Sequence, residues 1–163
     1  MKTVGLTGGI ACGKSSVAEI LRSELHLTVI DADQVSRDIT SEGSVGLAWI
    51  VEAFGAEVLA ADGTLDRKAL GRIVMQREER RRQLEAITHP LIHEEISSRL
   101  NALESAGSAV AVVEAALMVE TGNYTLYDHV IVVSASRETQ VRRLAERNGF
   151  GQDEAARWVD SQM

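Results

Sequence analysis

The fold of this chain is decided by the stretch Gly8-Gly9-Ile10-Ala11-Cys12-Gly13-Lys14-Ser15. These residues match G-x-x-x-x-G-K-S/T, the pattern of a phosphate-binding loop. A short apolar run, Thr3 to Leu6, precedes the loop as a predicted strand, and an amphipathic stretch from Lys14 to about Leu25 follows it as a predicted helix. Glycines let the backbone N–H groups converge on phosphate oxygens, and the N-terminus of the helix adds about half a positive charge. The order strand, loop, helix predicts a nucleotide-binding α/β domain.

The side chains of the loop have distinct expected roles. Lys14 can reach the β- and γ-phosphates of a nucleotide, and the Ser15 hydroxyl can ligate Mg²⁺. Cys12 is either a small residue that fits the loop or, because a helix N-terminus activates thiols, a redox-sensitive one. A glycine-rich turn with a coincidental Lys-Ser pair is the structural alternative, and such a chance match is rare because glycine makes up only about 7% of residues. The predicted nucleotide contacts are Gly8, Gly9, Ile10, Ala11, Cys12, Gly13, Lys14, Ser15 and Ser16.

The rest of the chain alternates apolar strands with helical stretches. Further strands are predicted at Leu27 to Ile30, Ala109 to Val113 and His129 to Val133, and helices at Ser136 to Arg147 and Gln152 to about Ser161. Continuous apolar strands separated by helices are typical of a buried parallel sheet with right-handed crossovers. The stretch from Ala32 to about Leu103 reads as helical, with turn signals inside it. Because it is too long for a simple crossover, we expect a helical insertion at about 32–105.

Composition and charge exclude several classes of protein. The chain has 163 residues, 45% of them hydrophobic and 25% charged, and a net charge of −7, which is ordinary for one globular domain. An acidic chain is disfavoured in nonspecific binding to nucleic acid or to an anionic membrane. The single cysteine excludes an internal disulfide and a Cys-rich zinc site. No apolar run reaches the ~18 residues of a spanning helix, and the first residues lack a signal-peptide layout. We therefore expect a cytoplasmic protein without nucleic-acid or membrane partners, as a monomer or a weak homo-oligomer.

Acidic residues follow the predicted strands. In open α/β sheets, ligands bind beyond the carboxyl ends of the strands. Asp33, two residues after Asp31 at the end of the second strand, is the candidate base for a substrate hydroxyl during phosphoryl transfer. Asp31 could order Mg²⁺-bound water, and Glu114 at the end of the third strand could ligate Mg²⁺ indirectly. For the two aspartates, capping of the next helix is the alternative.

Two arginine-bearing stretches have open interpretations. Arg143 and Arg147 share a helix face, so the region of about 136–160 is a candidate lid whose arginines would neutralise the γ-phosphate. An exposed amphipathic helix is the alternative. The basic stretch from Arg67 to Gln83 is either a solvated helix face or a patch facing an anionic substrate. His89-Pro90 is expected at a helix start, because proline favours the first helical position.

Several motifs, in their order along the chain, resemble the dephospho-coenzyme A kinase family. They are the phosphate loop, Ile30-Asp31-Ala32-Asp33 with Arg37, Thr88-His89-Pro90-Leu91-Ile92, Glu114 to Glu120, and a tail with Gln140, Arg143, Arg147 and Gln162. The family transfers the γ-phosphate of ATP to the 3′-hydroxyl of the ribose of dephospho-CoA, the last step of CoA synthesis. The resemblance implies an α/β, three-layer P-loop kinase-like fold with a mostly parallel sheet, a helical substrate-binding insertion and a lid. It also implies ATP and Mg²⁺ as cofactors and dephospho-CoA as the substrate.

The resemblance implies roles for individual residues as well. The expected catalytic residues are Asp33 as the base, Lys14, Arg143 and Arg147, and the expected metal ligands are Ser15 and Glu114. Contacts to dephospho-CoA are expected from Asp33, Arg37, His89, Leu117 and Glu120. For Glu120, solvation at the surface is the alternative. Two other functions stay open: a kinase for another small molecule or nucleoside, and a nucleotide-binding module without catalysis.

The chain departs from the family pattern at three places. Glu114-Ala115-Ala116-Leu117-Met118 stands where the family often has Asp-x-Pro-Leu-Leu, and the acidic residue is kept. Ala11 and Cys12 stand where the family usually has glycine and serine. Because residues with a Cβ favour negative φ, we expect Ala11 to adopt an ordinary backbone conformation and to stiffen the loop. The family continues past Gln162 with a further strand and a final helix. We expect both to be absent from this single domain of residues 1–163.

Overall fold

The computed structural model describes residues 1–161, so Gln162 of the expected family tail lies outside the described residues. The chain divides into two compact units, which are described here one at a time. The first comprises Met1–Asp31 and the chain from Leu103 onward, and the second is Ala32–Ala102. Within the described residues, no helix is both long and apolar enough to cross a lipid bilayer.

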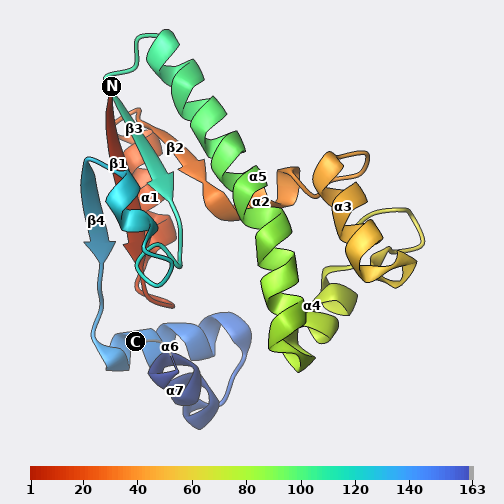
Figure 1. Ribbon diagram of the computed structural model, residues 1–163. Helices are drawn as coiled ribbons and strands as arrows, with labels where there is room; N and C mark the ends of the chain where they lie inside the picture. The colour runs from red at the N-terminus through yellow and green to blue at the C-terminus, as the bar shows by residue number, and fades with distance from the viewer. Residues whose placement is uncertain (162–163) are drawn as a thin grey trace. The chain divides into compact units, whose positions relative to one another are not determined.

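The first unit is built on a parallel sheet, which among the described residues has four strands (Figure 1). In chain order these are β1 (Lys2–Gly8), β2 (Thr28–Asp31), β3 (Val110–Glu114) and β4 (His129–Val133), and a short 3-10 helix, η2 (Asn123–Leu126), precedes β4. The spatial order is β2-β3-β1-β4, and every neighbouring pair is parallel. Each strand coincides with a predicted one to within two residues at either end, so the prediction of an α/β fold with a parallel sheet is confirmed.

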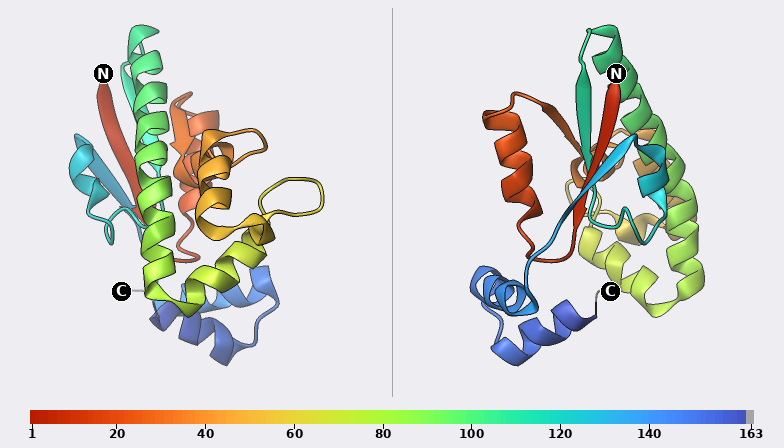
Figure 2. Two further views of the ribbon diagram at one scale, coloured as in Figure 1. Left: turned by 45° about the vertical axis from the view of Figure 1, so that its right-hand side comes forward. Right: turned by 90° about the vertical axis from the view of Figure 1, so that its left-hand side faces the viewer.

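The centre of this unit is supplied by β1 and β3. Leu6 on β1 and Val112 and Val113 on β3 are buried, as expected for apolar strands that are paired on both sides. The helix α1 (Lys14–Ser23) lies along one face of the sheet (Figure 2), where Ala18 and Leu21 pack with Leu6. This packing fixes the start of α1 relative to the end of β1, and with it the loop that joins them.

Two further helices, α6 (Arg137–Asn148) and α7 (Gln152–Asp160), follow β4 and pack against each other. The side chain of Ser136 caps the start of α6, and Gly149 ends the helix in the left-handed conformation, with φ of 68°. Both helices agree with those predicted for this part of the chain. The buried apolar residues of the pair are Val141, Leu144, Ala155 and Val159.

The second unit is helical, in agreement with the pattern of its sequence. Its elements are α2 (Ala32–Asp38), α3 (Val45–Phe54), the 3-10 helix η1 (Ala56–Val58), α4 (Arg67–Gln76) and α5 (Glu78–Ser105), whose last residues belong to the first unit. Ser44 and Asp66 accept backbone N–H groups at the starts of α3 and α4. The core of this unit comprises Ile50, Phe54, Val58 and Leu70.

The prediction of a helix start at His89-Pro90 is wrong. Pro90 lies in the interior of α5. Proline lacks the N–H that would donate to the carbonyl of Ala86, and its ring crowds that carbonyl, so its place inside a helix costs about 3 kcal/mol, which other contacts must offset. Leu84 and Ile87, in the turns before Pro90, pack against the core of the second unit. These contacts hold the helix together where the local preference of proline alone would end it.

Candidate nucleotide-binding site

The phosphate loop turns into α1 at Gly13, the N-cap residue, whose φ is 102°. This conformation is open to glycine and costly for a residue with a Cβ. A Cβ at this position would also come within 3.3 Å of Nη1 of Arg143. The N–H of Cys12 donates to the carbonyl of Gly9 at 3.3 Å, which closes the turn. Lys14 and the exposed Ser15 therefore lie in the first turn of α1, as the motif predicts.

Ala11 does not have the ordinary backbone conformation that the sequence predicts. Its φ is 56°, in the left-handed region, which costs a residue with a Cβ about 1–2 kcal/mol. The side chains of Ile10 and Ala11 pack against the buried cluster of α6 and α7, and this contact helps to offset the cost. The prediction is wrong because it used the intrinsic preference of alanine, whereas the packing of the loop against α6 and α7 sets φ here.

An ion pair between Lys14 and Glu114 lies at the root of the loop. Nζ of Lys14 is 2.7 Å from Oε1 of Glu114, and the two side chains are only 15% and 7% exposed. Arg22, in the last turn of α1, places Nη2 3.7 Å from the other carboxylate oxygen. Charges with so little access to water need partners. Glu114 therefore holds the Lys14 ammonium beside the loop, and Arg22 supports the carboxylate from its second side.

The register of the sheet explains why these groups meet. Leu6 of β1 is paired with Glu114 of β3, and Glu114 is paired with Asp31 of β2. On the other side of β1, Gly8 is paired with Val133, the last residue of β4. The four strands thus end along one edge of the sheet, the edge at which open α/β sheets bind ligands.

The helix α6 places two polar side chains on the loop. Nε2 of Gln140 donates to the carbonyl of Ile10 at 2.9 Å and lies 3.1 Å from Sγ of Cys12. Nη1 of Arg143 donates to the carbonyl of Cys12 at 3.1 Å. Arg143 is therefore beside the loop, whereas Arg147, one turn later, donates from Nε to Oδ1 of Asn148. The structure brings one of the two expected arginines to the loop.

Burial distinguishes the other loop residues. Cys12 is buried, which favours its interpretation as a small residue that fits the loop. Gly9, Ser15 and Ser16 are exposed, so their polar groups are accessible to a ligand. Gly8 lies so close to β4 that a Cβ would collide with the carbonyl oxygen of Val133.

The residues expected to contact the acceptor lie on other elements. Asp33 and Arg37 are exposed in the first and last turns of α2, and His89 is exposed on α5, so these three belong to the second unit. Leu117 and Glu120 are exposed in the segment between β3 and η2, in the first unit. Exposure at all five positions is compatible with contact to a ligand.

Arginines of the basic stretch from Arg67 to Gln83 contact other groups of the second unit, either one turn away on α5 or on earlier elements. Nη2 of Arg82 lies 2.6 Å from Oε1 of Glu78, one turn earlier on α5. The guanidinium of Arg80 lies over the ring of Phe54, 5.6 Å from its centroid. These contacts favour the interpretation of a solvated helix face over that of a patch for an anionic substrate.

Similarity to known proteins gives the family of the chain. A family model described as dephospho-CoA kinase matches residues 2–163. The chain belongs to the dephospho-CoA kinase family. A dephospho-CoA kinase from Corynebacterium glutamicum is 47% identical over 163 residues, which make up 100% of this chain and 81% of that protein. The resemblance noted from the sequence motifs is confirmed.

Solved structures place the fold in the same family. A structure of a dephospho-CoA kinase from Campylobacter jejuni has a TM-score of 0.69 and 32% identity, over 99% of this chain and 81% of that one. A crystal structure of a Thermus thermophilus protein has a TM-score of 0.82 and 30% identity, over 99% of this chain and 80% of that one. The predicted P-loop kinase-like fold is confirmed.

Two residues of this dephospho-CoA kinase family member have site contacts that the sequence did not reveal. Gln140 belongs to the family pattern, but its sequence position does not indicate its two contacts to the loop. Arg22 matches no motif, and its position against Glu114 depends on pairing residues far apart in the chain. The available signal was modest, namely a basic residue in the last turn of the same helix that begins with Lys14.

Proposed function

We propose that this chain transfers the γ-phosphate of ATP to the 3′-hydroxyl of the ribose of dephospho-CoA, giving CoA and ADP. The observation that carries the proposal is the Lys14–Glu114 pair at the root of a phosphate loop, in a chain that the dephospho-CoA kinase family model matches over residues 2–163. The loop supplies the means to hold a nucleotide. The family supplies the identity of the acceptor.

Lys14 and the loop amides would hold the phosphates of ATP. The ammonium of Lys14 is compact, carries three donors, and is already held beside the loop by Glu114. The start of α1 adds the positive end of the helix dipole at the same place. Arg143, which reaches the loop from α6, would stabilise the charge that spreads over the γ-phosphate oxygens during transfer. Arg147 would join it in a lid spanning about 136–160.

The donor set at the edge of the sheet fits Mg²⁺. Magnesium prefers oxygen ligands and is usually held by one or two protein groups together with substrate phosphates. The Ser15 hydroxyl and the Glu114 carboxylate are such groups. The described residues contain no cluster of three or more His, Cys, Asp or Glu side chains that could hold a metal, and Mg²⁺ held in this way does not require one. When bound, the ion neutralises charge on the β- and γ-phosphates.

Asp33 would act on the acceptor. It lies in the first turn of α2, two residues after Asp31 at the carboxyl end of β2, and its side chain is exposed. In the transfer, the ribose 3′-oxygen bonds to the γ-phosphorus, and the bond from that phosphorus to the bridging oxygen of ADP breaks. The hydroxyl proton passes to the carboxylate of Asp33. Arg37, His89, Leu117 and Glu120 would hold dephospho-CoA, with the insertion at about 32–105 carrying the first two.

The proposal is tested with the purified chain, ATP, Mg²⁺ and dephospho-CoA. We expect ADP release in step with a product that gains one phosphate and co-elutes with CoA. ADP release that does not depend on dephospho-CoA would contradict the acceptor assignment. Faster turnover with a nucleoside or nucleotide acceptor than with dephospho-CoA would favour a different small-molecule kinase. Tight ATP binding with no acceptor turned over would favour a binding module.

A further inference from the structure

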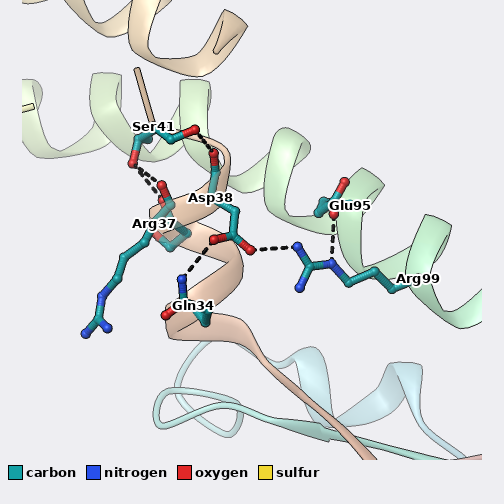
Figure 3. Close-up of polar contacts among 8 residues, drawn as sticks. Gln34, Arg37, Asp38, Ser41, Glu95 and Arg99 are labelled. Carbon is teal, nitrogen blue, oxygen red and sulfur yellow. Dashed lines mark hydrogen bonds and ion pairs between the residues drawn. The ribbon is translucent and has the colours of Figure 1, made fainter. Parts of the chain in front are cut away.

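A chain of polar contacts ties α2 to α5 within the second unit (Figure 3). We call Gln34, Asp38, Glu95 and Arg99 the Asp38 latch. Nη2 of Arg99 donates to Oδ2 of Asp38 at 2.7 Å, and Nε of Arg99 donates to Oε1 of Glu95 at 2.7 Å. Nε2 of Gln34 donates to the other oxygen of Asp38 at 2.8 Å. Arg99 and then Gln34 hold the pKa of the Asp38 carboxyl below its usual range.

The helix α2 depends on contacts of this kind. It has seven residues, and isolated helices shorter than about 12 residues are marginal in water. Val35 is its buried apolar side chain, which fixes one side of the helix but leaves rotation about the helix axis weakly constrained. Asp38, in the last turn, is tied to α5 through Arg99. A buried side chain together with a polar tie one turn later defines the orientation of a short helix.

The latch and the acceptor residues occupy neighbouring faces of α2. Residues four apart share a helix face, so Gln34 and Asp38 form one pair and Asp33 and Arg37 form another, offset by one residue. In Figure 3 the Arg37 side chain extends away from Asp38 and Arg99. The contact with α5 is thus made by the neighbouring face, and the exposed Asp33 and Arg37 take their orientation from the helix that this contact holds.

The latch is better suited to orientation than to global stability. The Asp38 and Arg99 side chains are 40% and 36% exposed, and ion pairs in such positions add little to the free energy of unfolding. A misplacement of about 1 Å in a reacting group can nevertheless lower a rate about 100-fold. Arg99 also joins two carboxylates through different nitrogens, which the fork of a guanidinium allows and a lysine ammonium does not reproduce.

We propose that Arg99 is a positioning residue of the kinase, which acts through Asp38 to set the orientation of the α2 face that carries Asp33 and Arg37. This inference rests on the proposed function, because Asp33 and Arg37 are assigned to the acceptor there. Arg99 itself touches neither substrate. Removing the Arg99 side chain lowers the efficiency with which dephospho-CoA is used. It leaves the affinity for ATP unchanged, since the phosphate loop belongs to the first unit.

The first test compares Arg99→Met with Arg82→Met. Both variants remove an arginine of α5 that pairs with a carboxylate one turn earlier, but only Arg99 also reaches α2. We expect Arg99→Met to lower kcat/KM for dephospho-CoA about 10- to 100-fold, with the dissociation constant of ATP and the melting temperature nearly unchanged. Arg82→Met should match the wild type. If Arg99→Met instead weakened ATP binding and lowered the melting temperature along with acceptor turnover, its role would be merely structural and the proposal would be overturned.

The second test is a cycle with Asp38→Asn. If Arg99 acts through Asp38, the double variant is no slower than the slower single variant. Additive losses would mean that Arg99 acts independently of Asp38, which overturns the proposal. Arg99→Lys should recover little of the lost turnover.

Amide hydrogen exchange separates this inference from the proposed function. Arg99→Met should speed exchange in α2 and leave β1 and α1 unchanged, whichever acceptor the chain uses. Faster exchange in α2 in a chain that does not phosphorylate dephospho-CoA would refute the proposed function alone. Unchanged exchange in α2 would refute the latch.

Discussion

The ammonium of Lys14 lies 2.7 Å from the carboxylate of Glu114, so two residues 100 positions apart in the chain form the charged centre of the site. Lys14→Met removes the cation and leaves a nearly buried carboxylate whose remaining ion-pair partner, within residues 1–161, is Arg22 at 3.7 Å. We expect ATP binding to fall sharply and the free energy of unfolding to drop by about 1–3 kcal/mol. Calorimetric ATP titration and denaturant unfolding measure the two effects.

A second substitution separates stability from function at this pair. In the double variant Lys14→Met with Glu114→Gln, no buried charge is left unpaired, so much of the lost unfolding free energy should return. ATP binding should not return, since the cation is still missing. Recovery of both, or of neither, would contradict the assignment of Glu114 as the partner that holds Lys14.

Asp33→Asn tests the proposed base. The amide keeps the size of the side chain but cannot take up the hydroxyl proton, so kcat should fall about 10²- to 10⁴-fold while ATP affinity changes little. Initial rates and ATP titrations measure the effect. Glu52→Gln, at an exposed position on α3, serves as the control and should leave both unchanged. Wild-type turnover in Asp33→Asn would remove the base role.

Arg143→Ala tests the arginine that reaches the loop from α6. Its guanidinium donates to the Cys12 carbonyl, and an arginine that stabilises phosphoryl transfer contributes about 10³–10⁵ in rate. We expect a loss toward the lower end of that range in kcat, with a smaller change in the KM for ATP. The neighbouring exposed Arg142→Ala is the matched control. Equal effects of the two variants would show that only net charge on α6 matters.

Two glycine substitutions should change the free energy of unfolding in opposite directions. In Gly8→Ala the new Cβ collides with the backbone carbonyl of Val133, so β1 and β4 must separate at the base of the loop. Overpacking of this kind costs about 1–3 kcal/mol. In Gly71→Ala the Cβ enters open space in the middle of α4, where alanine stabilises a helix by about 0.5–1 kcal/mol. Thermal and denaturant unfolding of both variants give the comparison, and a stabilised Gly8→Ala would contradict the close approach of the strands.

Asp128 predicts a dependence of stability on pH. The backbone N–H of Thr3, the Lys2 ammonium and the Thr3 hydroxyl lower the pKa of the Asp128 carboxyl below its usual range. A carboxyl with a lowered pKa in the folded state stabilises the fold above the unfolded pKa of about 3.9. That contribution is lost as the pH falls through the folded pKa.

The comparison of wild type with Asp128→Asn measures this effect. At pH 7 the variant should have a lower free energy of unfolding, because it lacks the ionised carboxylate that accepts from Thr3, near the start of β1, at the position just before β4. The difference should shrink steadily as the pH is lowered below about 4. A difference that stays constant down to pH 2 would show that the ionised form is not what matters.

Local patterns predicted much of this molecule. The loop from Gly8 to Ser15 and the strand His129–Val133 are identified by residues adjacent in the chain, and the structure has them where the sequence indicated. The ties between Arg22 and Glu114 and between Asp38 and Arg99 could not be found in this way. Each joins residues 61 or more positions apart, and single charged residues carry no signal of their partner.

The two wrong predictions share a cause. The conformation of Ala11 and the place of Pro90 were inferred from what each residue prefers in isolation. Both preferences are worth only about 1–3 kcal/mol, and packing overrides them where Ala11 meets α6 and α7 and where the turns before Pro90 meet the core of the second unit. Preferences of this size predict well only where nothing packs against the residue.

The central place of β1 has a consequence for synthesis on the ribosome. Lys14 leaves the ribosome 100 residues ahead of Glu114, an interval of about 5–20 s at 5–20 residues per second. The segment Ala32–Ala102, whose compact unit is continuous in the chain, emerges whole within that interval. The nascent chain can therefore complete its helical unit before β1 has a neighbour, and the capacity to hold a nucleotide arises only after β3 has been made.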